Sequence, residues 1–273
     1  MLEYLESGFA SALWQMVSGV LSFVFVAYIL HAVGTKLKAN MAALLGKVYR
    51  IVVIPGEFVR NVGISLACMI TGVKVRRHII TNDATGSYAS ITHSRIEAGT
   101  PTGFIRNLVI LTAPIWFGCV VIVVIALIAG GTGLIPDVKG AMPSEDIGAV
   151  SYVTAVFAAA VTMLLSFVCV WHWTSPFCLF CLMCFVSIAT EITIDTRGIW
   201  AIKAGLFGIF VGLIFLNAIP GISTAISSIG RTVRPVLFGL QATLIFVAMF
   251  DFVAVLIFGG LNRVTHNKSK KTK

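Results

Sequence analysis

Charged residues are scarce in this sequence. Only 11% of the 273 residues are Asp, Glu, Lys or Arg, whereas 58% are hydrophobic and the mean hydropathy is +0.98. Soluble domains carry about 25% charged residues, so this composition excludes an ordinary soluble domain, a disordered chain and a free-standing nucleic-acid binder. The 20 basic residues outnumber the 11 acidic ones. Because they gather in short loops and at the C-terminal end, membrane lipid headgroups are the expected partner, with no nucleic acid.

Long apolar runs occupy most of the chain. A transmembrane helix needs about 20 mostly apolar residues, and runs of this kind predict an all-α polytopic membrane protein with six or seven transmembrane helices. We expect one membrane domain over residues 1–273 in a multi-pass integral protein, with the cell membrane as its location. The expected spans are 10–32, 51–73, 107–130, 148–172, 175–190, 199–217 and 236–258.

The segments between the apolar runs carry turn and strand signals. Alternating polar and apolar residues around the turn-forming Asn-Asp-Ala-Thr-Gly predict a small surface β-hairpin over 76–95. Glycine, proline and serine predict polar loops at 131–147 and 218–235. The end of the chain, 263–273, is predicted to be a solvated basic tail.

The run 51–73 differs from the others because it contains Glu57, Arg60 and Asn61. An arginine at the centre of a membrane helix costs about 2.5–3.5 kcal/mol on insertion scales, so Arg60 requires a partner. Glu57 lies one helical turn earlier and could pair with it locally. The segment either crosses the membrane or re-enters it, and counting charges in the loops does not decide between the two.

The stretch from Pro55 to Ile64, followed by Gly-Val-Lys-Val at 72–75, resembles the motif helix of the site-2-protease class of intramembrane zinc metalloproteases. In that class, a helix that opens with Pro-Gly carries His-Glu-x-x-His and ends in Gly-x-x-Val before a surface hairpin. The resemblance covers about 45–215. It places Arg60 and Ile64 at the two histidine positions and Asn61 at the glutamate position.

These replacements imply a catalytically inactive relative that holds neither a metal nor a cofactor. Arginine stays protonated, isoleucine has no lone pair and an asparagine amide is not a general base, so Arg60, Asn61 and Ile64 cannot bind zinc or activate water. The resemblance also places Asp195 where the class has its third zinc ligand. An Arg60–Asp195 ion pair is therefore expected in place of the metal.

Asp251 is a second carboxylate inside an apolar run. It could pair with Lys203 if the last two spans are antiparallel, because both lie at a similar depth by helix rise. Alternatively, Asp251 could be part of a proton or ion relay with Gln241 and Asn217 as further polar positions. The pairing is preferred, since a transport path usually contains more ionisable groups.

Small residues recur every four positions on the 199–217 span, at Ala204, Gly208 and Gly212. Such a ridge lets two helices approach closely in lipid, so this face is expected to contact another helix, of this chain or of a partner. In contrast, Cys178, Cys181 and Cys184 spread around a helix at their three-residue spacing. They are expected to pack in the core rather than to bind a metal.

The sequence thus favours a non-catalytic integral membrane protein that acts as scaffold, accessory subunit or regulator of another membrane protein. The alternative is a subunit of a transporter or of a proton- or ion-conducting complex that uses its intramembrane charges. An active hydrolase with an unconventional metal site ranks last.

Overall fold

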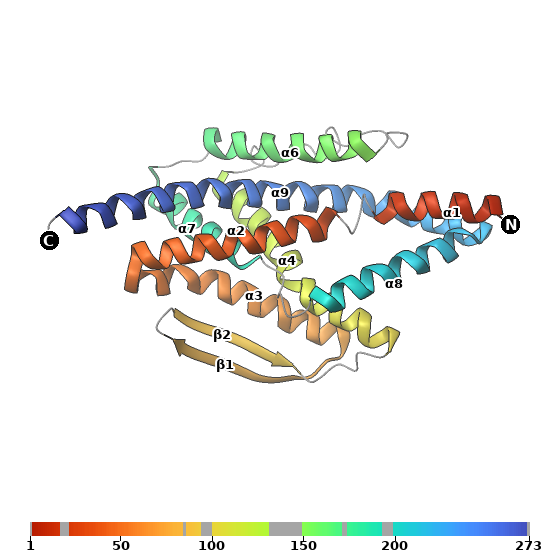
Figure 1. Cartoon of the computed structure of the whole chain (residues 1–273), viewed down its shortest axis with the longest axis horizontal. Helices are drawn as coiled ribbons and strands as arrows, with labels where there is room; N and C mark the ends of the chain where they lie inside the picture. The colour runs from red at the N-terminus through yellow and green to blue at the C-terminus, as the bar shows by residue number, and fades with distance from the viewer. Residues whose placement is uncertain are drawn as a thin grey trace.

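The computed structural model describes residues 2–16, 22–83, 86–93, 100–130, 149–170, 174–192 and 199–271. Apart from one pair of strands, the elements of these ranges are helices (Figure 1). In chain order they are α1 (Leu2–Gln15), α2 (Ser22–Leu45), the 3-10 turn η2 (Gly46–Val48), α3 (Tyr49–Thr71), β1 (Val75–Asp83), β2 (Gly86–His93), α4 (Pro101–Gly130), α6 (Ala149–Val170), α7 (Pro176–Glu191), α8 (Ile199–Asn217) and α9 (Pro220–Lys271).

Four helical stretches of the described residues are long and apolar enough to cross a membrane. The protein is therefore a helical, membrane-embedded chain. Length and composition support this smaller number of spans rather than the six or seven expected, because α7 and the described apolar part of α8 are shorter than a full span. The four stretches are Phe25–Thr71, Ile105–Ala129, Val150–Cys169 and Thr232–Val264.

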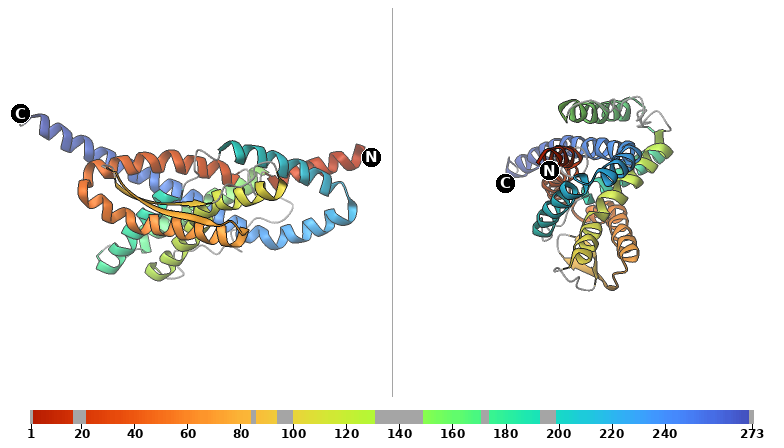
Figure 2. Two further views of the ribbon diagram at one scale, coloured as in Figure 1. Left: turned by 90° about the horizontal axis from the view of Figure 1, so that it is seen from below. Right: turned by 90° about the vertical axis from the view of Figure 1, so that its right-hand side faces the viewer.

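The first of these stretches contains two helices that run in opposite directions. The chain turns back at η2, where Gly46 adopts a φ of +52°, a left-handed value that suits glycine. Figure 2 shows α2 and α3 joined at this reversal, at the left of its first view. α3 then ends at Gly72, whose φ is +69° and whose N–H donates to the Met69 carbonyl, while the Val73 N–H donates to the Cys68 carbonyl.

Two sequence predictions about helices are wrong. The expected span 10–32 is not one helix, because α1 ends at Gln15 and α2 begins at Ser22. The expected loop 218–235 is instead the first part of α9. Pro220 suits the start of a helix, and the apolar side chains at 222, 226, 229 and 233 recur at helical spacing, which outweighs the glycine and serine content.

α9 runs along much of the molecule and organises the other helices around it (Figure 1). α2 lies along one side of α9, and α6 lies along α9 on the side away from α3 and the strands. α1 and α8 pack on each other near the N-terminus. The helix continues to Lys271, so most of the predicted basic tail 263–273 is the helical end of α9.

The main hydrophobic core lies where α4, α6, α7 and α9 meet. Phe185 of α7 is fully buried against three other phenylalanines, with ring centroids 4.8 Å from Phe250, 5.4 Å from Phe167 and 5.6 Å from Phe246. These edge and tilted contacts join α6, α7 and α9. The core thereby fixes α7, the helix that carries the candidate site.

β1 and β2 pair antiparallel, in the segment for which the sequence predicts strands. Asp83 and Gly86 are opposite each other at the turn end, and an irregularity in register lies between Val75 and Arg77. In Figure 1 the pair lies along the outer side of α3, with β2 nearer to the helix. The pair therefore follows directly from the end of α3 and covers part of that helix.

Candidate functional site

Three charged side chains from different helices meet at the end of α7. Glu191 is 3% exposed. Its Oε1 lies 2.6 Å from Nζ of Lys38 on α2, and its Oε2 lies 3.3 Å from a guanidinium nitrogen of Arg60 on α3. We call Lys38, Arg60 and Glu191 the ion-pair cluster. One carboxylate therefore links three helices through two cations.

A close contact between α3 and α7 sets the position of this cluster. The Gly56 N–H donates to Ser187 Oγ at 2.8 Å, and the Ser187 hydroxyl donates to the Val53 carbonyl at 3.1 Å. A Cβ at Gly56 would lie 2.2 Å from the Ser187 carbonyl oxygen, so only glycine allows this approach. Pro55 lacks an N–H and lies beside Gly56, inside α3 rather than at its start as the resemblance implies.

The same contact explains why Arg60 meets Glu191. Arg60 lies four residues after Gly56 on α3, and Glu191 lies four residues after Ser187 on α7. Residues four apart lie on the same face of a helix, one turn further along. When Gly56 is against Ser187, the next turn of each helix therefore brings the guanidinium to the carboxylate.

The ion pair of Arg60 differs from the sequence expectation. The partner that the structure provides is Glu191, which the sequence analysis did not select, whereas Asp195 lies outside the described residues. Glu57 and Asn61 are half-buried on α3 near Arg60. Arg60 thus has a carboxylate partner, as the cost of a charge in a membrane demands. This carboxylate is Glu191 at the end of α7 rather than Asp195.

Asp251 of α9 is a second buried carboxylate close to the cluster. It is fully buried, and neither of its oxygens has a hydrogen-bond partner among the described residues. Lys38 of the ion-pair cluster lies on α2, the helix that packs along α9. Lys203, the partner that the sequence analysis expected for Asp251, has its side chain outside the described residues.

The chain was compared with protein-family models, with curated proteins and with solved structures. None of them matches. The resemblance of 45–215 to the site-2-protease class therefore rests on the sequence motif alone. Within the part of the chain that the structure describes, no three His, Cys, Asp or Glu side chains gather in a way that could hold a metal ion.

The two polar residues proposed as relay positions lie in separate networks. Gln241 accepts a hydrogen bond from the Tyr152 hydroxyl at 2.8 Å. Asn217 donates to the Gln15 side-chain oxygen at 3.1 Å and joins α8 to α1. Gln241 precedes Asp251 by ten residues, which is about 15 Å along a helix. The described structure therefore does not bring these residues to Asp251.

The glycine ridge of α8 faces open space among the described residues. A Cβ built on Gly208 or on Gly212 meets nothing within 4 Å, while one on Gly63 or Gly118 would meet neighbouring side chains at 3.0 and 2.6 Å. The side chain of Ala204 lies outside the described residues. Among the described residues, therefore, no side chain packs closely against Gly208 or Gly212, unlike the glycines of α3 and α4.

The cysteines of α7 are free thiols. Cys178 and Cys181 are buried, and Cys178 Sγ lies 3.9 Å from the Ala129 carbonyl of α4, whereas Cys184 is half-buried. Packing in the core is therefore the role that the contacts of Cys178 and Cys181 support, as expected from their helical spacing.

Sequence reasoning missed Lys38, Ser187 and Glu191. Lys38 follows the expected first span, and Glu191 follows the run 175–190 by one residue, so both fell outside the expected membrane segments. One signal was available. Ser187 and Glu191 have the same four-residue spacing as Gly56 and Arg60. Two helices that carry equal spacings can bring both pairs of residues into contact, Gly56 with Ser187 and Arg60 with Glu191.

Proposed function

We propose that this chain is a non-catalytic, multi-pass integral membrane protein that acts as scaffold, accessory subunit or regulator of another membrane protein in the cell membrane. The observation that carries this proposal is the open ridge at Gly208 and Gly212. In lipid, helices associate through close packing of small residues rather than through hydrophobicity. An unoccupied ridge on a membrane helix suits a helix of a second protein.

The ion-pair cluster supports the non-catalytic part of the proposal. Hydrolysis by the resembled class needs imidazoles that hold zinc and a carboxylate that activates water. Here the position of the first imidazole carries Arg60, whose guanidinium is 3.3 Å from Glu191, and Lys38 is on the other carboxylate oxygen. Two fixed cations beside one carboxylate repel a divalent ion and already neutralise the acid.

The cluster also suits a rigid scaffold. It connects α2, α3 and α7, and the glycine–serine contact at Gly56 and Ser187 adds two hydrogen bonds between α3 and α7. Polar contacts of this kind fix the register of helices in a membrane. These contacts would therefore hold α2, α3 and α7 together as one unit.

The number of crossings belongs to the same proposal. α7 has 16 residues and α8 has 19, or about 24 and 28 Å at 1.5 Å per residue. Both are close to the thickness of a thin or locally thinned bilayer. Together with α2, α3, α4, α6 and α9 they would complete seven crossings.

A photo-crosslinking amino acid at position 208 tests this function. In the native membrane, we expect one discrete adduct with a different integral membrane protein, identified by mass spectrometry. The adduct should disappear when Gly212→Leu is added, because a leucine fills the ridge. Gly260→Leu is the matched control, since Gly260 is also open but lies on α9.

Two results would contradict the proposal. One is an adduct with lipid only, which would make the ridge an ordinary lipid-facing surface. The other is an adduct with a second copy of this chain, which would make the ridge a self-association face rather than the contact with another protein.

The alternative is a subunit of a transporter or of a proton- or ion-conducting complex. A specific observation favours it: Asp251 is fully buried, without a hydrogen-bond partner among the described residues. Ionisable groups of this kind often mark ion or proton paths in membranes. Proton flux into liposomes that contain the purified chain, abolished by Asp251→Asn, would favour this alternative over the scaffold.

A further inference from the structure

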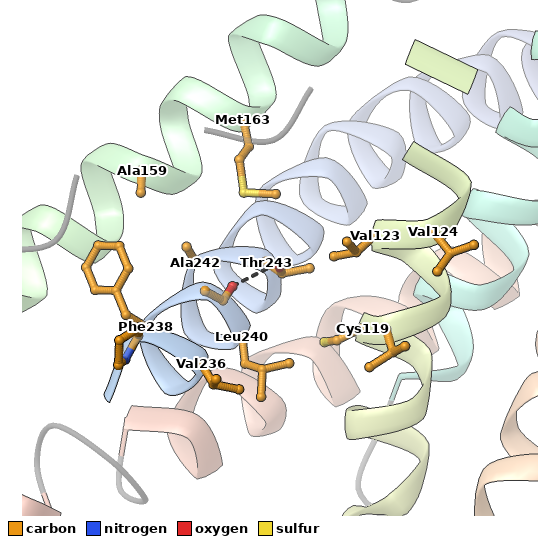
Figure 3. Close-up of a pocket in the computed structure, with 13 residues that line it drawn as sticks. Cys119, Val123, Val124, Ala159, Met163, Val236, Phe238, Leu240, Ala242 and Thr243 are labelled. Atoms are coloured by element: carbon orange, nitrogen blue, oxygen red, sulfur yellow. Dashed lines mark hydrogen bonds between the residues drawn. The ribbon is translucent and has the colours of Figure 1, made fainter. Parts of the chain in front are cut away.

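An apolar groove of about 340 Å³ lies between α4, α6 and α9. Figure 3 shows Met163 of α6 and Val123 of α4 on facing sides of it, with α9 as the floor. The Thr243 hydroxyl donates to the Gly239 carbonyl at 2.8 Å, so this lining residue keeps its hydrogen bond within its own helix. The groove therefore offers its occupant an apolar surface.

The groove opens toward the surroundings of the helices. Val120 and Val124 of α4 and Val236 of α9 line it and are 52%, 45% and 62% exposed. All three lie in stretches that are long and apolar enough to cross a membrane. In a bilayer, these side chains would face hydrocarbon, so an acyl chain can enter the groove from the side.

A cation that has no anionic partner among the described residues lies at one end of the groove. Arg234 directly precedes the lining residue Pro235, and its guanidinium carbon is 5.5 Å from the ring centroid of Tyr152. That ring is in edge contact with Phe238, which also lines the groove, at 5.8 Å. The Nε and Nη2 atoms of Arg234 are inaccessible to solvent and have no hydrogen-bond partner within the described ranges.

The buried guanidinium of Arg234 requires an anion, and its position in the chain indicates which anion this is. Arginine cannot lose its proton in a protein, so burial cannot be relieved by neutralisation. Arg234 also lies only two residues after Thr232, where the last candidate span begins. The ends of spans lie at the level of the lipid headgroups, where phosphate is the anion at hand.

We propose that this groove is a binding site for an anionic phospholipid. One acyl chain lies along α4, α6 and α9, and the headgroup phosphate accepts hydrogen bonds from Arg234. The volume is at the low end of the 300–1,000 Å³ range of ligand pockets, which suits a single chain rather than a whole lipid. Arginine donors and phosphate oxygens form strong, charge-assisted hydrogen bonds.

Native mass spectrometry of the full chain tests the site. The detergent-solubilised protein is titrated with phosphatidylglycerol and with phosphatidylcholine of the same acyl chains. We expect one phosphatidylglycerol to be retained per chain. Arg234→Gln should weaken its binding by about tenfold or more, because a hydrogen bond to a charged group is lost, and Arg234→Lys should weaken it less. Arg263→Gln is the matched control, an exposed arginine near the other end of α9.

A second pair of variants tests the acyl-chain part of the site. Val124→Phe fills the groove and should also lower retention, whereas Val253→Phe should not, because Val253 is equally exposed at 45% but does not line the groove. Phosphatidylglycerol with a photoactivatable group in its acyl chain should label peptides of α4, α6 and α9 in the unaltered protein, which needs no variant to fold.

Four results would overturn the proposal. Equal retention of the two lipids would show no preference for an anionic headgroup. Equal loss for Arg234→Gln and Arg263→Gln would reflect general surface charge. Labelling outside the groove, or unchanged retention in Val124→Phe, would mean that the acyl chain lies elsewhere.

Discussion

Replacing Glu191 with glutamine removes the carboxylate that Lys38 and Arg60 share. Glu191 is 3% exposed, so the substitution leaves two cations close together with a neutral amide between them. Removing one partner of a buried ion pair costs about 3–5 kcal/mol. The side chains of Lys38 and Arg60 are 23% and 37% exposed and can turn partly toward water, which lowers the expected loss to about 2–3 kcal/mol.

The two cations should contribute unequally. Arg60→Met leaves Glu191 paired with Lys38 at 2.6 Å, while Lys38→Met leaves it with the longer and more exposed Arg60 pair at 3.3 Å. We therefore expect the loss in stability to decrease in the order Glu191→Gln, Lys38→Met, Arg60→Met. The last should cost about 1 kcal/mol or less, as for other partly exposed ion pairs.

The assay is reversible unfolding of the full chain in lipid nanodiscs. Arg50→Met is the control, because Arg50 is an exposed cation on α3, the helix that carries Arg60. The double variant Arg60→Met with Glu191→Gln should lose less free energy of unfolding than the two single variants lose in sum, since removing both partners leaves less uncompensated charge. Strictly additive losses, or a loss in Arg50→Met equal to that in Arg60→Met, would refute the pairing.

Further predictions concern packing and buried polar groups. Gly56→Ala should destabilise the fold by about 2 kcal/mol or more and lower the thermal midpoint, because its Cβ would overlap the α7 backbone. Gly208→Ala is the control and should leave the midpoint nearly unchanged, because no described atom lies within 4 Å of its Cβ. Equal effects of the two variants would contradict the close contact between α3 and α7. Asp251→Asn should raise the thermal midpoint in nanodiscs, because a neutral amide replaces a buried carboxylate that has no hydrogen-bond partner among the described residues. A lowered midpoint would show that its charge is needed. Tyr152→Phe should cost about 1 kcal/mol in chemical unfolding by removing the hydrogen bond to Gln241, and no change would mean that this bond does not stabilise the helix pair.

The sequence predicts helices well where a continuous apolar run ends at a residue that stops a helix. The run 51–73 became α3, and Gly72 ends it with a left-handed φ that other residues rarely adopt. The same reasoning failed at 218–235, because glycine and serine content was given more weight than the helical spacing of the apolar side chains. It also failed at 10–32, where apolar composition alone cannot show that one helix ends and another begins.

The candidate site shows a different limit. A charge such as Arg60 in an apolar helix predicts that a carboxylate must lie nearby, and this was met. Which carboxylate it is depends on how α3 packs against α7, two helices about 130 residues apart in the sequence. That packing follows from Gly56 admitting Ser187, a contact that spacing along one helix does not reveal.

The central claim is that a carboxylate shared by two cations, and not a metal, occupies the junction of α2, α3 and α7. The most direct measurement is the zinc content of the full chain, purified without chelators and measured by elemental mass spectrometry. The account predicts zinc far below one ion per chain, unchanged in Glu191→Gln. One tightly bound zinc per chain that is lost in Glu191→Gln would contradict it.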